Sequence, residues 1–146
     1  MRQDTKLESQ GAEFLVLGHL LIDGISAYKT YINFPGYDLI AVNHDSNKVA
    51  RIQVKSRWAT DYDKSFPLKN LDCDFVVHVA LNRGFRFSKK NTIESGFGVP
   101  IFYVFPIDKI GEARRDSGWN KVQIKNIDNF EIYINNWDLI KKHLTP

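Results

Sequence analysis

A short stretch of the chain, ARIQVKSR at residues 50–57, places polar side chains at alternate positions. Because successive side chains of a β-strand point to opposite faces, Arg51, Gln53 and Lys55 would share one face while apolar residues take the other. Gln53 and Lys55 would then stand roughly 7 Å apart along the strand. Any half-exposed strand has this pattern, so the alternation alone favours an ordinary polar surface.

Two acidic residues make a functional site more plausible than the alternation does. Asp38 begins the preceding segment of strand character, YDLIAVN, although aspartate is depleted in strands and is also common in turns. A short hairpin would place Asp38 beside Gln53. Glu13 lies on an N-terminal segment of helical periodicity whose neighbours are largely apolar. We therefore expect Glu13, Asp38, Gln53 and Lys55 to converge.

The elements that must position these residues follow from periodicity and turn signals. We expect a first helix over residues 5–22, strands over 25–33, 37–43, 48–56, 73–81 and 100–107, a short helix near 108–116, short strands within 121–127 and 130–134, and a terminal helix capped by Asn135 or Asn136. Residues 82–98 are expected to form a long loop or hairpin. One stripe of the first helix contains Leu7, Gly11, Phe14, Gly18 and Leu21, and its glycines suggest close packing against the sheet. From Phe14 onward this helix is apolar nearly all round, which predicts burial on more than one side.

The order of a helix glutamate, an aspartate at a strand start and a Gln-x-Lys strand resembles the PD-(D/E)XK nuclease superfamily. This superfamily includes restriction enzymes, Holliday-junction resolvases and some homing endonucleases. The resemblance covers about residues 5 to 105 and departs from the usual pattern in two places: Gly36-Tyr37 stand before the aspartate, and Gln53 replaces an acid. It implies a restriction-endonuclease-like α/β fold, with a mixed β-sheet of about five strands flanked by helices in the order αβββαβ.

The resemblance also implies a reaction, the hydrolysis of phosphodiester bonds in duplex or branched DNA. A Mg²⁺ ion, for which Mn²⁺ may substitute, would be held by Asp38, the side-chain oxygen of Gln53 and the backbone carbonyl of Val54. Lys55 would stabilise charge in the transition state. Glu13 would bind the metal through water or orient Lys55. These four side chains, Glu13, Asp38, Gln53 and Lys55, form the expected catalytic set.

A loop rich in basic and aromatic residues indicates how DNA would be held. Residues 82–91, NRGFRFSKKN, interleave cations with two phenylalanines, as in loops that grip a nucleic-acid backbone and stack on bases. A solvated hairpin is an equally good explanation of the same composition. The residues expected to contact DNA are Arg51, Arg57, Arg83, Arg86, Lys89 and Lys90.

Bulk composition sets the remaining limits. The 146 residues are enough for one domain, which we expect to be a single nuclease domain spanning 1–146. A formal net charge of +3 permits a polyanionic partner without requiring one. The single cysteine excludes an internal disulfide and a Cys-based zinc site, and with no apolar signal or membrane-spanning segment it favours a cytoplasmic protein. The four histidines have no metal-ligand spacing.

Three functions stay open from the sequence. The first is the endonuclease, which we expect to be a homodimer or a higher homo-oligomer because cutting both strands requires two sites. The second is a non-catalytic nucleic-acid-binding module on a degenerate nuclease fold, in which Gln53 marks the loss of the metal. The third is a structural or partner-binding protein for which Arg51, Gln53 and Lys55 are only a polar face.

Overall fold

The structure, a computed structural model, describes residues 5–30, 37–61, 65–86, 95–117 and 120–146. The helices are α1 (Thr5–Ile22), α2 (Ile107–Ser117) and α3 (Asp138–Leu144), and the strands are β1 (Ser26–Lys29), β2 (Leu39–Asn43), β3 (Lys48–Arg57), β4 (Ser65–Pro67), β5 (Phe75–Ala80), β6 (Ile101–Pro106) and β7 (Lys121–Gln123). Two 3₁₀ turns, η1 (Ile124–Asn126) and η2 (Phe130–Tyr133), precede α3. The first helix and the five main strands were all predicted from the sequence.

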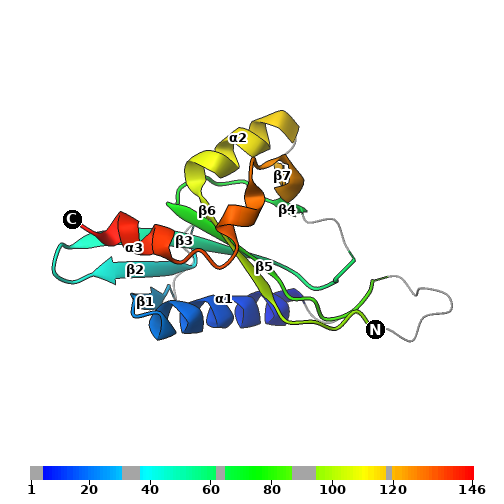
Figure 1. The fold of residues 1–146 in the computed structure, drawn as a ribbon, viewed down its shortest axis with the longest axis horizontal. Helices are drawn as coiled ribbons and strands as arrows, with labels where there is room; N and C mark the ends of the chain where they lie inside the picture. The colour runs from blue at the N-terminus through cyan, green and yellow to red at the C-terminus, as the bar shows by residue number, and fades with distance from the viewer. Residues whose placement is uncertain (1–4, 31–36, 62–64, 87–94, 118–119) are drawn as a thin grey trace.

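A mixed sheet with strand order β1-β2-β3-β5-β6 forms the centre of the molecule (Figure 1). Adjacent strands in this sheet are antiparallel, except β3 and β5, which run parallel. Every residue of β5 is buried, as expected for a central strand with layers on both faces. Because β3 and β5 are parallel, their carboxyl ends lie at the same edge of the sheet.

Helices and a small second sheet cover the two faces. One face packs on α1 and α3 through a core that includes Val16, Leu20 and Ile140. The other packs on α2 and on the β4-β7 ribbon, with Phe66 and Ile110 at its centre. Figure 1 shows these layers, with α1 below the sheet and α2, β4 and β7 above it. The predicted α/β architecture is confirmed.

The connection between β3 and β5 differs from the predicted αβββαβ order. The described part of this connection, residues 58–61 and 65–74, contains the strand β4 and no helix. Pro67 lies within it, and a proline in a helix interior removes a hydrogen bond and clashes with the preceding turn. The second long helix, α2, instead follows β6.

The carboxyl-terminal region corrects two further expectations. The segment 130–134 was expected to be a strand, yet Phe130–Tyr133 form the 3₁₀ turn η2 after Asn129, which has a left-handed φ of 53°. The residue before α3 is Trp137, not Asn135 or Asn136, and it makes no side-chain cap hydrogen bond. Trp137 is 7% exposed, so burial of its indole decides where the helix begins.

The orientation of α1 is also the reverse of the sequence prediction. The residues that face the sheet are Ala12, Val16 and Leu20, each fully buried. The stripe running from Leu7 to Leu21, which was expected to pack on the sheet, faces away from it. The expectation of burial on more than one side is therefore wrong as well, because Phe14 and Leu21 are about half exposed (54% and 52%).

Among the described residues, no helix is long and apolar enough to cross a membrane.

Candidate active site

The backbone of Asp38 is fixed on both sides at the start of β2. Its N–H donates to the Ile52 carbonyl (2.8 Å), while its own carbonyl accepts from the N–H and the hydroxyl of Thr30 (3.0 and 2.9 Å). The register of β2 and β3 pairs Leu39 with Ile52. One pair further along the same register, Asp38 lies opposite Gln53, so both side chains belong to one face of the sheet.

The carboxylate of Asp38 reaches across to β3. Its Oδ2 accepts the backbone N–H of Val54 at 2.9 Å, where β2 has no further residue to accept this hydrogen bond. Backbone groups of successive strand residues point to alternate sides, and Ile52 O already points toward β2. The Val54 carbonyl therefore points into the same gap beside Asp38.

Gln53 contains a buried oxygen that lacks a partner. Its Oε1 has no hydrogen-bond partner among the described residues. Leaving a buried acceptor unsatisfied costs about 1–3 kcal/mol, so such an atom calls for an explanation such as an unfilled ligand position. An amide oxygen beside a carboxylate and a backbone carbonyl is the kind of donor set that a hard divalent cation prefers.

Lys55 lies two residues further along β3, on the same face as Gln53. It is paired in register with His78 of β5, a fully buried residue whose ring stacks on Phe66 at 5.2 Å between centroids. Burial lowers the pKa of the Lys55 ammonium, and the negative charge of Asp38 opposes that shift. Lys55 is thus a half-buried cation within the field of the Asp38 carboxylate.

Glu13 approaches from α1 and interacts electrostatically with Asp38. Burial raises the pKa of its carboxyl group, the Asp38 carboxylate raises it further, and Lys29 lowers it. The Oε1 of Glu13 lies 3.9 Å from Lys29 Nζ, and both side chains are largely covered (17% and 13% exposed). The ion pair of Glu13 is thus formed with Lys29, which does not support the expected role of orienting Lys55.

Lys29 is the residue at this site that the sequence did not single out. It ends β1 within a segment whose alternation looked like that of any half-exposed strand. Its ammonium also lies 4.4 Å from the centroid of the Phe14 ring. The only sequence signal was a lysine within the predicted strand that precedes Asp38.

The predicted DNA-contacting residues lie in different settings. Arg51 is bound to Asp74 through Nε at 3.3 Å, and Arg57 donates through Nε to the Ser65 carbonyl. Arg83 is exposed and holds its guanidinium 4.0 Å from the ring centroid of Phe97. Arg86 is exposed, and its backbone N–H donates to Asp61. Lys89 and Lys90 lie outside the described residues.

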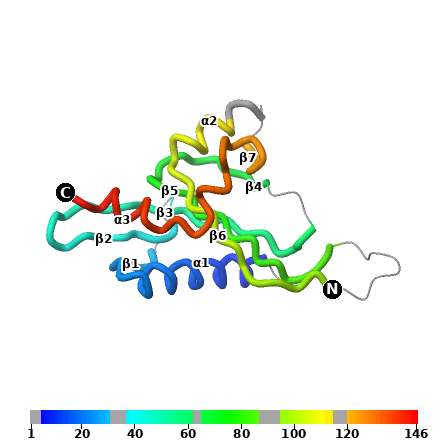
Figure 2. Tube along the Cα trace, in the orientation of Figure 1, coloured from blue at the N-terminus to red at the C-terminus, as the bar shows by residue number. Residues whose placement is uncertain are grey.

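The base of the segment between β5 and β6 is built as a hairpin. Arg83 and Phe97 form an antiparallel bridge, and Gly98 N–H donates to Asn82 O at 2.9 Å. Gly96 has a φ of +78°, and a Cβ there would come within 2.8 Å of the Phe85 ring. This hairpin leaves from the carboxyl end of β5 (Figure 2). The parallel register pairs Lys55 with His78 near the same end of the sheet.

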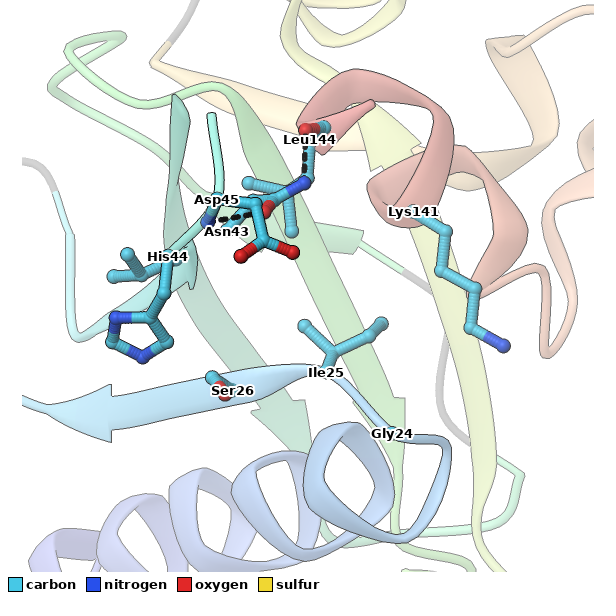
Figure 3. A pocket seen from close by; sticks show the side chains of 9 residues that line it. Gly24, Ile25, Ser26, Asn43, His44, Asp45, Lys141 and Leu144 are labelled. Atoms are coloured by element: carbon cyan, nitrogen blue, oxygen red, sulfur yellow. Dashed lines mark hydrogen bonds between the residues drawn. The ribbon is translucent and has the colours of Figure 1, made fainter. Parts of the chain in front are cut away.

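A separate pocket of about 330 Å³ lies at the opposite end of β2 (Figure 3). Ser26, His44, Asp45 and Lys141 are among its lining residues, and Asn43 donates to the Leu144 carbonyl at its wall. Ser26 pairs with Val42 whereas Lys29 pairs with Leu39, so the pocket and Asp38 are at different ends of the β1-β2 hairpin. This pocket is not the predicted site.

Other chemistry is limited within the described part of the chain. No group of three or more His, Cys, Asp or Glu side chains gathers there in a way that could hold a metal ion. The thiol of Cys73 is buried, and burial raises its pKa to about 12, so it stays protonated and unreactive at neutral pH.

The structure is similar to that of the bacterial homing endonuclease I-Ssp6803I, with a TM-score of 0.60 and 20% sequence identity, covering 95% of this chain and 93% of that one. The chain has the restriction-endonuclease-like fold. Hjc, a Holliday junction resolvase from the archaeal hyperthermophile Archaeoglobus fulgidus, aligns over 70% of this chain and 75% of its own with a TM-score of 0.43 and 15% identity. No protein-family model matches the sequence, and no curated protein does. Within this fold, Asp38, Gln53 and Lys55 lie at one end of the mixed sheet.

Proposed function

We propose that this chain is a metal-dependent DNA endonuclease that hydrolyses phosphodiester bonds in duplex or branched DNA. The observation that carries the proposal is the buried Oε1 of Gln53, which has no hydrogen-bond partner in the described part of the chain. It lies opposite Asp38, on the strand face that also bears Lys55. A polar face with no function would satisfy this oxygen or expose it to water.

The residues present fit a divalent cation. Asp38, Gln53 Oε1 and the Val54 carbonyl would hold Mg²⁺, or Mn²⁺ in its place, and Glu13 would reach it through water. When bound, the metal would supply Lewis-acid activation of the attacking water and neutralise charge on the phosphate. Because Gln53 brings no charge, this set has one negative charge fewer than a site with two carboxylates at these positions.

Lysine and arginine side chains of the chain would stabilise the phosphate charge and bind the DNA backbone. Lys55 would stabilise negative charge on the scissile phosphate, and its half-buried position would strengthen that interaction relative to water. Arg83 and Arg86 would hold the DNA backbone from the hairpin at the same end of the sheet, with Lys89 and Lys90 as further predicted contacts. Arg51 and Arg57 are the least suited to DNA, because Arg51 is bound to Asp74 and Arg57 to the Ser65 carbonyl.

The deciding experiment measures cleavage of supercoiled plasmid and of branched DNA at low salt, with Mg²⁺ or Mn²⁺, by the wild type and by Lys55→Ala. We expect metal-dependent cutting by the wild type and a loss of at least about 100-fold in the variant, the scale found when one transition-state-stabilising group is removed. DNA affinity and the circular dichroism spectrum should stay close to wild type. Cleavage by Lys55→Ala at the wild-type rate would refute the assignment.

A second candidate is a non-catalytic DNA-binding module on the same fold. The neutral Gln53, together with the absence of a three-residue acidic, histidine or cysteine cluster from the described residues, favours it over an enzyme with unrelated chemistry. Calorimetric titration with Mn²⁺ separates the two candidates. Binding by the wild type that is lost in Asp38→Ala supports the enzyme, whereas DNA binding without any metal binding supports the module.

A further inference from the structure

The outward face of α1 is apolar and uncovered. An outer stripe made of Leu7, Gly11, Phe14, Gly18 and Leu21 runs along the helix directly opposite the buried residues that face the sheet. Leu7 is 60% exposed, and Ile22 at the end of the helix is 86% exposed. Figure 1 shows α1 along the margin of the molecule, with the sheet on one side of it only. Three large apolar side chains on one helix face are more than scattered surface hydrophobes.

The two glycines of the outer stripe have no role within the described chain. A Cβ placed at Gly11 or Gly18 would meet nothing within 4 Å. Each glycine costs its helix roughly 1 kcal/mol relative to alanine, and neither has the positive φ that would require glycine. Small residues between large ones leave shallow notches into which the backbone of another helix can approach closely.

We propose that the outer stripe binds a second copy of this chain, with the two α1 helices packed antiparallel about a two-fold axis at Phe14. The spacing of the stripe is almost the same when it is reversed about Phe14. Leu7 of one copy would therefore meet Leu21 of the other, and Gly11 would meet Gly18. A two-fold interface requires this self-complementarity, because each residue pair must occur twice.

The helix dipoles support the antiparallel direction. Two parallel helices in contact would align their macrodipoles unfavourably, whereas antiparallel helices place opposite ends beside each other.

This arrangement would complete the proposed nuclease, and this consequence rests on the proposed function. Glu13 lies on one flank of α1, between the outer stripe and the buried residues that face the sheet. A two-fold axis perpendicular to both helices keeps each flank on the same side of the pair. Both Glu13 residues, and with them both Asp38 sites, would open to one side, where a single duplex can reach them together.

Analytical ultracentrifugation tests the interface without requiring activity. The wild-type chain of 16.9 kDa should sediment at about twice that mass or a multiple of it. Leu21→Glu should halve the mass, because two buried charges would replace two apolar contacts. Ile132→Glu, at an exposed apolar residue (59%) of η2, is the matched control and should leave the mass unchanged. A monomeric wild type, or a Leu21→Glu variant that keeps the wild-type mass, would overturn the proposal.

Cysteine cross-linking tests the direction of packing. Phe14→Cys should form a disulfide-linked dimer on oxidation, because two residues at the axis face each other. Leu7→Cys should not, because antiparallel packing separates its two copies by roughly 20 Å along the helices, whereas a disulfide needs α-carbons within about 7 Å. The native Cys73 is buried and does not compete. Cross-linking through both positions would mean parallel packing and would reject the antiparallel arrangement.

Discussion

At the scale of single residues, the candidate site brings like charges together and buries charged groups, which destabilises the protein while no metal is bound. The carboxylates of Asp38 and Glu13 interact, and the cations Lys29 and Lys55 are both partly withdrawn from water. Active sites commonly lower the folding stability of a protein in this way, because their charged groups are placed to stabilise a transition state and not the free protein. This destabilisation predicts measurable effects on stability.

Glu13 should make stability fall as pH rises. Its pKa is raised above the ordinary 4.5, so between that value and its pKa in the folded protein the native state binds more protons than the unfolded state. The stability associated with the neutral carboxyl is present below pH 4.5 and is lost as pH rises through the folded pKa. We expect Glu13→Gln to be more stable than wild type at pH 7 in the presence of a chelator. Urea denaturation at several pH values measures this difference, which should vanish at pH 4; a constant difference would contradict the pKa argument.

Restoring the acid at Gln53 should strengthen metal binding. Gln53→Glu adds a carboxylate opposite Asp38, so without metal the two like charges lower the melting temperature. With millimolar Mn²⁺ the variant should gain more stability than wild type, since a ligand that binds only the folded state stabilises it by RT ln(1 + [L]/Kd). Thermal melts with and without Mn²⁺ measure both effects. Gln123→Glu on β7, in the small second sheet, is a control that should show no metal-dependent change.

At the scale of elements, the carboxyl ends of β3 and β5 would determine which surface of the proposed nuclease meets DNA. The parallel pairing of β3 and β5 brings Lys55 and the β5-β6 hairpin to the same edge. The hairpin base is held by the Arg83-Phe97 bridge and by a hydrogen bond from Thr60 N–H to Gly84 O (2.9 Å). A cationic hairpin fixed beside a candidate phosphate-cleaving group would position the DNA backbone, not merely attract it.

Neutralising the hairpin should weaken DNA binding in a salt-dependent manner. We expect Arg83→Gln to lower affinity at low salt and to reduce the slope of log K against log salt by about one, the effect of losing one phosphate contact. Fluorescence anisotropy over a salt series measures this slope. Lys142→Gln makes the same charge change on α3, at the other end of the molecule, and should leave the slope unaltered. Equal slopes for Arg83→Gln and wild type would mean that Arg83 makes no phosphate contact and that the hairpin is an ordinary solvated loop.

At the scale of the whole molecule, one chain supplies one candidate site, and cutting a duplex requires two. If α1 pairs with α1 of a second copy, plasmid cleavage and assembly should be linked. The wild type should convert supercoiled plasmid to the linear form, whereas Leu21→Glu should accumulate nicked circles, because a monomer cuts one strand per encounter. Gel analysis of the time course distinguishes the two products. If Leu21→Glu forms linear product at the wild-type rate, double-strand cutting does not depend on this interface.

The sequence by itself determined the five main strands, the hairpin of β2 and β3, and the position of Asp38 beside Gln53. Alternation in β3 and the aspartate before β2 were sufficient to place Gln53 and Lys55 on one face and to predict Asp38 opposite Gln53. These are local features, because strand periodicity and short hairpins depend on neighbours in the chain. The fold family followed from the same residues, and the structural similarity to a homing endonuclease agrees with it.

Only the tertiary structure decided which side of α1 faces the sheet, what Glu13 pairs with and where α3 begins. A helix that is apolar nearly all round has no periodic signal to choose between its two faces, so packing chose Ala12, Val16 and Leu20 and left the glycine stripe outside. The Glu13-Lys29 pair joins a helix to a strand, and no spacing along the chain encodes that contact. Burial of Trp137 overrode the asparagine caps because its contacts with the sheet come from residues distant in sequence.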